Sequence, residues 1–351
     1  MVRECARLIL RDFNSFHSQR RSKLLHSCIQ TTSVAHERCW KLDTSRRRSY
    51  ATNKTSSPSS GLQDPSAYCR DFVKRHDRDS YLTSLFFPKH LQNACFAVKA
   101  FYVELAMIQD IVSSPMIGQM RMQFWRDALK GMAEGKPPRH PIALALHEAS
   151  EAANIPPYHL KRILEAREKD LDAPPHITMD TLLAHAESTS STLNYVLLSL
   201  LNLSSSETFS HAASHIGVAQ TLVTLLRALP YHASKGRMVI PASITAKHGV
   251  NQEEVFRRGP EANGIEDAVY EFAVVANDHL LTARGMFKEG ESAKMKVPSE
   301  AIPVILGAVP AVNYLSRLEA ANFNAFEPKL QTRDSIRLPW QIWRSHFRKG
   351  F

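Results

Sequence analysis

The sequence predicts an all-α protein, and three observations support this fold class. From Asp64 onward, apolar residues recur at the three- and four-residue spacing of a helix, whereas the alternating pattern of a strand is scarce. The helical segments are interrupted by the proline pairs 137–138, 156–157 and 174–175 and by the serine run 204–206. With 44% hydrophobic residues among 351, the chain can bury a large core. We therefore expect one all-α domain of roughly ten helices over residues 65–351.

The N-terminal segment differs from the rest in composition. Residues 1–50 are rich in Arg and Ser and hold 11 Lys and Arg against 4 Asp and Glu, so most of the chain's net charge of +10 belongs here. This composition is typical of a mitochondrial presequence, and residues 46–52 resemble a matrix-processing site with cleavage before Ala51. The alternative is a basic arm that binds nucleic acid or membrane. Residues 51–64 are predicted to be a linker that is too polar to form a core.

Within the body, four helical segments are predicted in chain order. A buried helix is expected over residues 96–108, and Thr178 is expected to cap a helix that runs through Leu182 and Leu183. Two further segments place apolar residues on one helix face. Their apolar residues are, in the first, Leu193, Val196, Leu197, Leu200 and Leu201 and, in the second, Ile216, Ala219, Val223 and Leu226.

Several kinds of site are not expected from the sequence. The five cysteines form no CxxC pair and no zinc spacing, and neither a P-loop nor a GxSxG or GxGxxG motif is present. The sequence contains no run of 18 or more apolar residues, so no membrane-spanning helix is predicted. His211 and His215 have the i, i+4 spacing of metal ligands, but we expect no acid to complete a triad with them, so we expect a solvated helix face. The interleaved charges of residues 165–172 are expected to form another solvated face.

Four segments, in order, resemble the phytoene/squalene synthase family of prenyltransferases. None is specific alone, but together they cover nearly all of residues 65–351. The resemblance implies an isoprenoid-synthase-like helical bundle around a central cavity. In active members, two Asp-rich motifs on facing helices hold Mg²⁺, which grips the diphosphates of two prenyl substrates. The segments are residues 80–110, residues 121–129 with 140–146, residues 164–171 with 184–201, and residues 220–241.

The sequence departs from both Asp-rich motifs. The first falls on residues 106–110, where only Asp110 is acidic, and the second falls on residues 227–232, where neither acid is present. A single carboxylate cannot hold a cluster of Mg²⁺ ions, because these ions need several oxygen ligands. This degenerate pattern, together with the presequence, resembles the family branch that assembles respiratory complex I. Pro230 also predicts a kink in this helix or its end just after Arg227.

The resemblance implies a vestigial pocket, with no catalytic residue, no metal ligand and no cofactor. Arg227 and Arg237 would either receive an anionic head group or form salt bridges with Glu104 or Asp110, because an unpaired buried Arg is costly. Glu104 and Asp110 are six residues apart and do not share one helix face closely. The residues assigned to this pocket are Glu104, Asp110, Gln220, Arg227 and Arg237.

The C-terminal segment carries an aromatic stripe. Trp340, Trp343, Phe347 and Phe351 fall at i, i+3, i+7 and i+11, and basic residues that include Arg344 and Arg348 accompany them. Aromatic and basic residues together suit an anionic membrane surface or a partner. The alternative, which we favour at this point, is a last helix that docks on the bundle with its aromatic stripe in the core.

Three functions are compatible with these observations. The first is a non-catalytic assembly factor for mitochondrial complex I, acting early in maturation of the peripheral arm at the matrix side of the inner membrane. Its partners would be complex I subunits or other assembly factors, and no nucleic acid. The second is a prenyl diphosphate transferase with an unusual metal site, and the third is a carrier of isoprenoids or other lipids. The missing acids favour the first.

Overall fold

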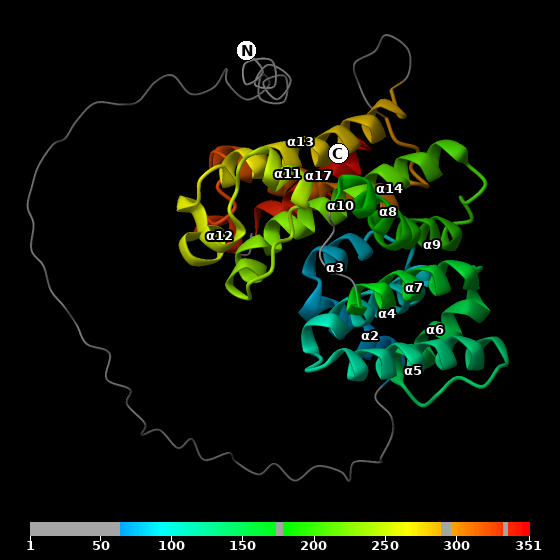
Figure 1. Ribbon diagram of the computed structural model, residues 1–351. Helices are drawn as coiled ribbons and strands as arrows, with labels where there is room; N and C mark the ends of the chain where they lie inside the picture. The colour runs from blue at the N-terminus through cyan, green and yellow to red at the C-terminus, as the bar shows by residue number, and fades with distance from the viewer. Residues whose placement is uncertain (1–63, 173–177, 289–295, 333–335) are drawn as a thin grey trace, which may run out of the picture. The chain divides into compact units, whose positions relative to one another are not determined.

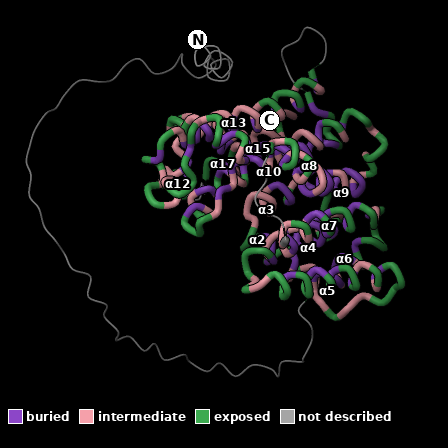
Figure 2. Tube along the Cα trace, viewed as in Figure 1, coloured by how far each residue is buried: buried purple, intermediate pink, exposed green. Residues whose placement is uncertain are grey.

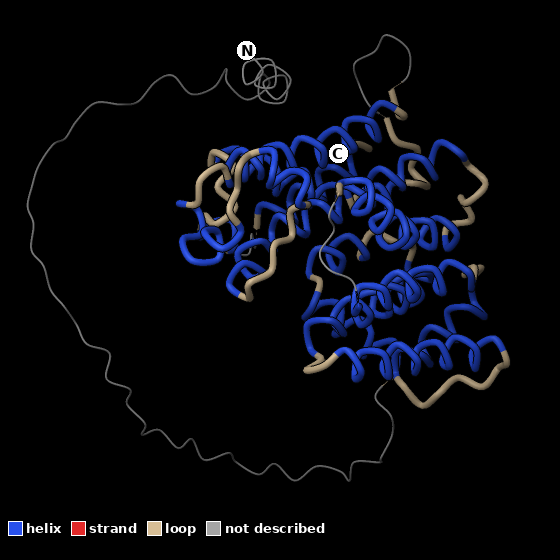
Figure 3. Tube along the Cα trace, in the orientation of Figure 1, coloured by secondary structure: helices blue, strands red, loops and turns tan. Residues whose placement is uncertain are grey.

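Helices are the only regular elements in the described part of the chain (Figure 3). The computed structural model describes residues 64–172, 178–288, 296–332 and 336–351, all within the unit Ser59–Phe351. The predicted presequence lies outside these residues, as does the predicted linker apart from Asp64. The expected all-α fold class is confirmed.

The α-helices outnumber the roughly ten expected because several are only one or two turns long. The longer ones are α2 (Pro65–His76), α4 (Gln92–Ile111), α5 (Pro115–Ala133), α6 (Pro141–Ala152), α7 (Pro157–Asp172), α8 (Met179–Ala186), α9 (Thr192–Leu200), α10 (Glu207–Ser234), α13 (Ile265–Gly285), α15 (Ala308–Ala320) and α17 (Arg337–Arg348). The short ones are α3 (Arg78–Ser84), α11 (Ala242–Lys247), α12 (Gln252–Arg258), α14 (Ile302–Ile305) and α16 (Pro328–Gln331).

Local sequence signals explain where many of these helices begin. Thr178 caps α8 as predicted, and its hydroxyl accepts a hydrogen bond from the backbone N–H of Thr181. Asp64 caps α2 in the same way, and Ser206 at the end of the serine run caps α10. Proline occupies the first position of α2, α5, α6 and α7, where its missing N–H removes no helical hydrogen bond.

The core forms where the predicted apolar faces meet. The expected buried face of α4 is buried throughout, as are the predicted apolar positions of α10 (Figure 2). Helix α10 packs along α13 and also contacts α9, α15 and the π-helical segment Glu187–Ser191 (Figure 1). Gly217 permits this last contact, because a Cβ atom there would lie 2.4 Å from the backbone nitrogen of Ser191. Helix α10 and the π-helical segment are therefore closely packed.

One of the two alternatives predicted from Pro230, an end of α10 just after Arg227, is wrong. The helix does not end just after Arg227 but continues through Pro230 to Ser234. Proline in a helix removes one backbone hydrogen bond and crowds the preceding turn, yet here it lies only about one turn from the helix end. Leu226 and Leu229 on either side of Arg227 are fully buried, and this packing holds the last turn in place. Arg227 consequently projects from a continuous helix.

Candidate functional site

A cavity of about 930 Å³ lies among α3, α4, α7, α9, α10 and α15. Four of the five residues assigned to a pocket from the sequence line it, namely Asp110, Gln220, Arg227 and Arg237. Glu104 is not among the lining residues. It does not share the cavity face of α4 with Asp110, as their spacing predicts, and burial raises the pKa of its carboxyl while Arg121 and His76 oppose that rise.

Arg237 forms an ion pair with Asp110 across the cavity. The guanidinium nitrogen lies 3.0 Å from the carboxylate oxygen, and the two side chains are 41% and 40% exposed. The turn after α10 directs Arg237 back toward α4. Gly236 has a φ of +67° there, a conformation that glycine adopts without strain, and the N–H of Arg237 donates to the carbonyl of His232. Asp110, the one acid left in the first motif, is thus already occupied.

Arg227 is paired with a residue that the sequence analysis missed. Its guanidinium lies 2.6 Å from the carboxylate of Asp79 in α3, and not beside Glu104 or Asp110, the two acids that the salt-bridge alternative named. The two side chains are 45% and 25% exposed, so this pair contributes little to stability. Asp79 follows the helix cap Asp77, and an acid in a first helical turn is usually a local feature. The local sequence around Asp79 therefore did not indicate that it lines a cavity or that it pairs with a residue 148 positions away.

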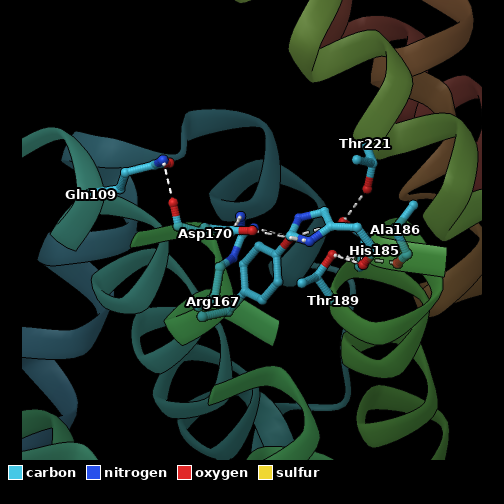
Figure 4. A network of polar contacts seen from close by, with 9 residues as sticks. Gln109, Arg167, Asp170, His185, Ala186, Thr189 and Thr221 are labelled. Carbon is cyan, nitrogen blue, oxygen red and sulfur yellow. Dashed lines mark hydrogen bonds and ion pairs between the residues drawn. The ribbon is translucent and has the colours of Figure 1, made fainter. Parts of the chain in front are cut away.

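A second polar group lies deeper, in the wall formed by α4, α7 and α8 (Figure 4). Arg167 donates to the carboxylate of Asp170 at 3.3 Å and to the hydroxyl of Tyr102 at 3.0 Å. His185 lies 3.3 Å from the other oxygen of Asp170. The hydroxyl of Tyr102 is in turn 2.8 Å from that of Ser190, so the network continues into the π-helical segment.

This network corrects the expectation that residues 165–172 form a solvated face. The side chains of Arg167 and Asp170 are only 19% and 16% exposed. Burial raises the pKa of the Asp170 carboxyl, although Arg167 beside it opposes the rise. The alternating charges suggested solvent, but the i, i+3 spacing of Arg167 and Asp170 already allowed an internal pair. Glu165, by contrast, is exposed and pairs with Lys161 on the outer side of α7.

Gln220 has a structural role within the cavity wall. Its amide nitrogen donates to the carbonyl of Gly307 at 2.9 Å, and its amide oxygen accepts from Asn194 at 3.2 Å. These contacts join α10 to α9 and to the start of α15. Both the nitrogen and the oxygen of the Gln220 amide therefore form hydrogen bonds within the protein.

The positions of the two degenerate motifs do face the cavity. Ala106 and Met107 line it from α4, and Ala228 and His232 line it from α10. Burial, and then the neighbouring Arg237, lower the pKa of His232, so its imidazole is neutral near pH 7. The facing helices therefore present methyl, thioether and neutral imidazole groups where the family places carboxylates.

The donor set does not fit a cluster of Mg²⁺ ions. Magnesium prefers carboxylate and other oxygen ligands in octahedral geometry. Asp79 and Asp110 line the cavity, and each is paired with a guanidinium. Over the described ranges, no three His, Cys, Asp or Glu side chains are grouped so that they could hold a metal. His215 contacts His279, with 2.8 Å between their Nδ1 atoms, whereas His211 is exposed beside Glu207.

The C-terminal helix α17 departs from the favoured sequence interpretation. It docks on the bundle as expected, but through Leu338 and Ile342. Trp340, Trp343 and Phe347 are 53%, 52% and 65% exposed, so their stripe is not part of the core. In the part of the chain that the structure describes, no helix combines the length and the apolar character needed to cross a membrane.

The helical bundle and the position of its cavity define the class of protein. The chain belongs to the squalene/phytoene synthase family, whose model matches residues 73–344. A crystal structure of a dehydrosqualene synthase in complex with ligand superposes with a TM-score of 0.66 at 17% identity, covering 81% of this chain and 95% of that one. At this identity the likeness shows the fold alone.

Closer relatives belong to a particular group within the family. The chain is 39% identical over 291 residues to "NADH dehydrogenase (ubiquinone) complex I, assembly factor 6" of Rattus norvegicus, covering 83% of this chain and 84% of that protein. The Homo sapiens protein of the same name is 36% identical over 284 residues, covering 81% and 82%. Phytoene synthase 2 of Oryza sativa subsp. japonica is more distant, at 23% identity.

Proposed function

We propose that this protein is a non-catalytic assembly factor for mitochondrial respiratory complex I. It acts in the matrix, peripherally on the inner membrane, at an early stage of peripheral-arm maturation, and its partners are complex I subunits or other assembly factors. The names of its relatives support the assembly role and a mitochondrial location. The Arg- and Ser-rich composition of residues 1–50 supports import through a presequence that is removed before Ala51.

The pairing of Asp79 with Arg227 and of Asp110 with Arg237 is the observation that carries the non-catalytic part. Ionisation of an allylic diphosphate produces a highly charged leaving group, which the family's enzymes stabilise with several carboxylate-bound Mg²⁺ ions. Here Asp79 and Asp110 are each neutralised by a guanidinium group. Metal binding would first have to break both ion pairs, and two separated acids would still supply too few ligands.

A carrier of isoprenoids or other lipids remains the second candidate, because the cavity itself favours it. Its volume of about 930 Å³ falls at the upper end of the range for small-molecule sites, about 300–1,000 Å³. Part of its wall is apolar, with Leu182, Leu193, Leu197 and Val223 among the lining residues. A protein that binds such a ligand without converting it would still lack turnover.

The assembly role is tested by deleting the gene and resolving the respiratory complexes by blue-native electrophoresis. We expect loss of complex I and its return when the wild-type chain is supplied. A normal level of complex I in the deletion strain would refute the assembly role.

The non-catalytic role is tested with the double variant Asp79→Asn/Asp110→Asn in the same strain. Both substitutions remove carboxylate ligands without changing side-chain size, and both sites are partly exposed, so folding should survive. We expect complex I to be restored, with chain abundance and thermal unfolding as controls. The proposal would be contradicted if a folded and abundant variant failed to restore complex I. It would also be contradicted if the wild type released diphosphate from farnesyl or geranylgeranyl diphosphate in a Mg²⁺-dependent reaction.

A further inference from the structure

Helix α17 is held to the bundle along one face only. Leu338 and Ile342 are buried there, and Leu338 also lines the cavity. Asn313 of α15 donates a hydrogen bond to the side chain of Gln341, and the ring of His346 lies 4.9 Å from that of Phe86. The helix is thus a fixed part of the domain, so its outer face is a defined surface.

That outer face carries four large apolar side chains in a row. Ile336, Trp340, Trp343 and Phe347 fall at i, i+4, i+7 and i+11, which places them on one side of the helix opposite Leu338. They are 83%, 53%, 52% and 65% exposed. Side chains of this size, gathered on one exposed face, indicate a surface that meets another apolar phase.

The charge around this row has a single sign. Residues 336–351 contain four Lys and Arg and no Asp or Glu. Arg337, Arg344 and Arg348 are spaced i, i+7 and i+11, which places them along one flank of the aromatic row. The guanidinium of Arg344 lies 5.4 Å from the ring centre of Trp340. An anionic partner is therefore the complement to this surface.

We propose that the outer face of α17 binds an anionic phospholipid membrane surface. The indole and phenyl rings enter the headgroup region, and the flanking arginines contact lipid phosphates, as in interfacial amphipathic helices. A bilayer fits better than a protein groove, because a fixed helix presents its rings as one row and the charged residues of 336–351 are all basic. The inference deepens the proposed function and rests on its membrane location. Leu338, on the inner face of the same helix, lines the cavity. Helix α17 then lies between the cavity and the membrane.

The test measures lipid contact at α17 directly, because residues 1–50 are basic and would bring any variant to anionic vesicles. The full chain carries Trp40→Phe in every sample. Of the other tryptophans, Trp125 is only 2% exposed, so quenching by brominated lipid reports on Trp340 and Trp343. Vesicles contain brominated phosphatidylcholine, with or without an anionic diphosphatidylglycerol. We expect quenching with the anionic vesicles that weakens as salt is added.

Two sets of variants leave both reporter tryptophans in place. Ile336→Glu with Phe347→Glu puts acids into the apolar row and should lower the affinity of α17 for the vesicle surface, read from the quenching of Trp340 and Trp343, by about tenfold or more. Arg344→Gln with Arg348→Gln should lower it about 25-fold, from about fivefold for each basic residue. The matched control, Met116→Glu with Met120→Glu, alters two side chains of α5 that are 71% and 67% exposed and should leave quenching unchanged.

Each outcome has a defined meaning. The proposal would be overturned if brominated lipid quenched no tryptophan fluorescence in the wild type, or quenched it equally in the Ile336→Glu/Phe347→Glu variant. Either result would favour a protein partner on α17. Equal loss in the α5 control would also overturn it, because binding would then not be specific to α17. Equal affinity for vesicles without the anionic lipid would refute the charge argument. Since the assay uses purified chain and lipid, it can fail while complex I assembly still depends on the protein.

Discussion

Replacing Arg167 by Met would leave Asp170 without its cationic partner in the wall of the cavity. Arg167 donates to Asp170 at 3.3 Å and to Tyr102 at 3.0 Å, so one substitution removes a charge pair and a second hydrogen bond. His185 would stay 3.3 Å from the carboxylate. Met fills a similar volume with an apolar chain, which limits the effect to the lost polar contacts.

The magnitude follows from the burial of the pair. Removing one partner of a fully buried ion pair costs about 3–5 kcal/mol, because a desolvated charge remains. The side chains of Arg167 and Asp170 retain 19% and 16% exposure, so we expect a loss of about 2–4 kcal/mol in the free energy of unfolding. For a domain of this size that corresponds to a fall in Tm of roughly 5–10 °C.

The loss should depend on pH in a defined direction. Burial already raises the pKa of Asp170 above its ordinary value of 3.8, and removing Arg167 takes away a group that lowers it. In the variant the folded state therefore binds a proton more readily than the unfolded state does. The destabilisation is complete at neutral pH and shrinks as pH falls through the raised pKa toward 3.8.

Thermal unfolding at about pH 7 and about pH 5 measures both effects. The matched control is Arg126→Met in α5. It removes the guanidinium that pairs with Glu168, which lies on α7 like Arg167 and Asp170. The side chains of Arg126 and Glu168 are 44% and 29% exposed, so we expect a change below about 1 kcal/mol. Equal effects of the two substitutions, or a loss in Arg167→Met that grows on acidification, would refute the reasoning.

Two further predictions concern stability. Gly217→Ala should destabilise the protein by about 1–3 kcal/mol, because the new Cβ would meet the backbone of Ser191. Gly285→Ala, with open space around it, should stabilise the protein by up to about 1 kcal/mol. Chemical denaturation measures both changes, and changes of the same sign would contradict this reasoning. Burial lowers the pKa of His215 and His279 below 6.5, so Tm should fall as pH drops below that value. His215→Gln/His279→Gln should flatten the fall, and an unchanged pH profile would contradict this.

The fold could be predicted from the sequence because helix periodicity and caps are local. Thr178 caps α8, and the apolar faces of α4 and α10 are buried, as their spacing predicts. The segment order also predicted the family. The candidate site was predicted only in part. Asp110, Gln220, Arg227 and Arg237 line one cavity, but Glu104 does not.

The remaining site residues depend on contacts between distant segments. Asp79 is 148 positions from Arg227, and nothing in its local pattern separates a cavity acid from a residue in a first helical turn. Arg167 and Asp170 lie in a run of alternating charges that is typical of solvated helices. Only the packing of α7 against α4 and the π-helical segment Glu187–Ser191 turns this pair inward and buries it.

The sequence by itself determined that this protein is all-α, that it resembles the prenyltransferases and that, apart from Asp110, the acids of both their metal motifs are missing. These properties follow from residue types and spacing along one chain. The tertiary structure decided that Asp79 and Asp110 are paired with Arg227 and Arg237, and that the aromatic row of α17 faces outward. Pairing and exposure depend on which helices pack together, and that is a property of the folded bundle.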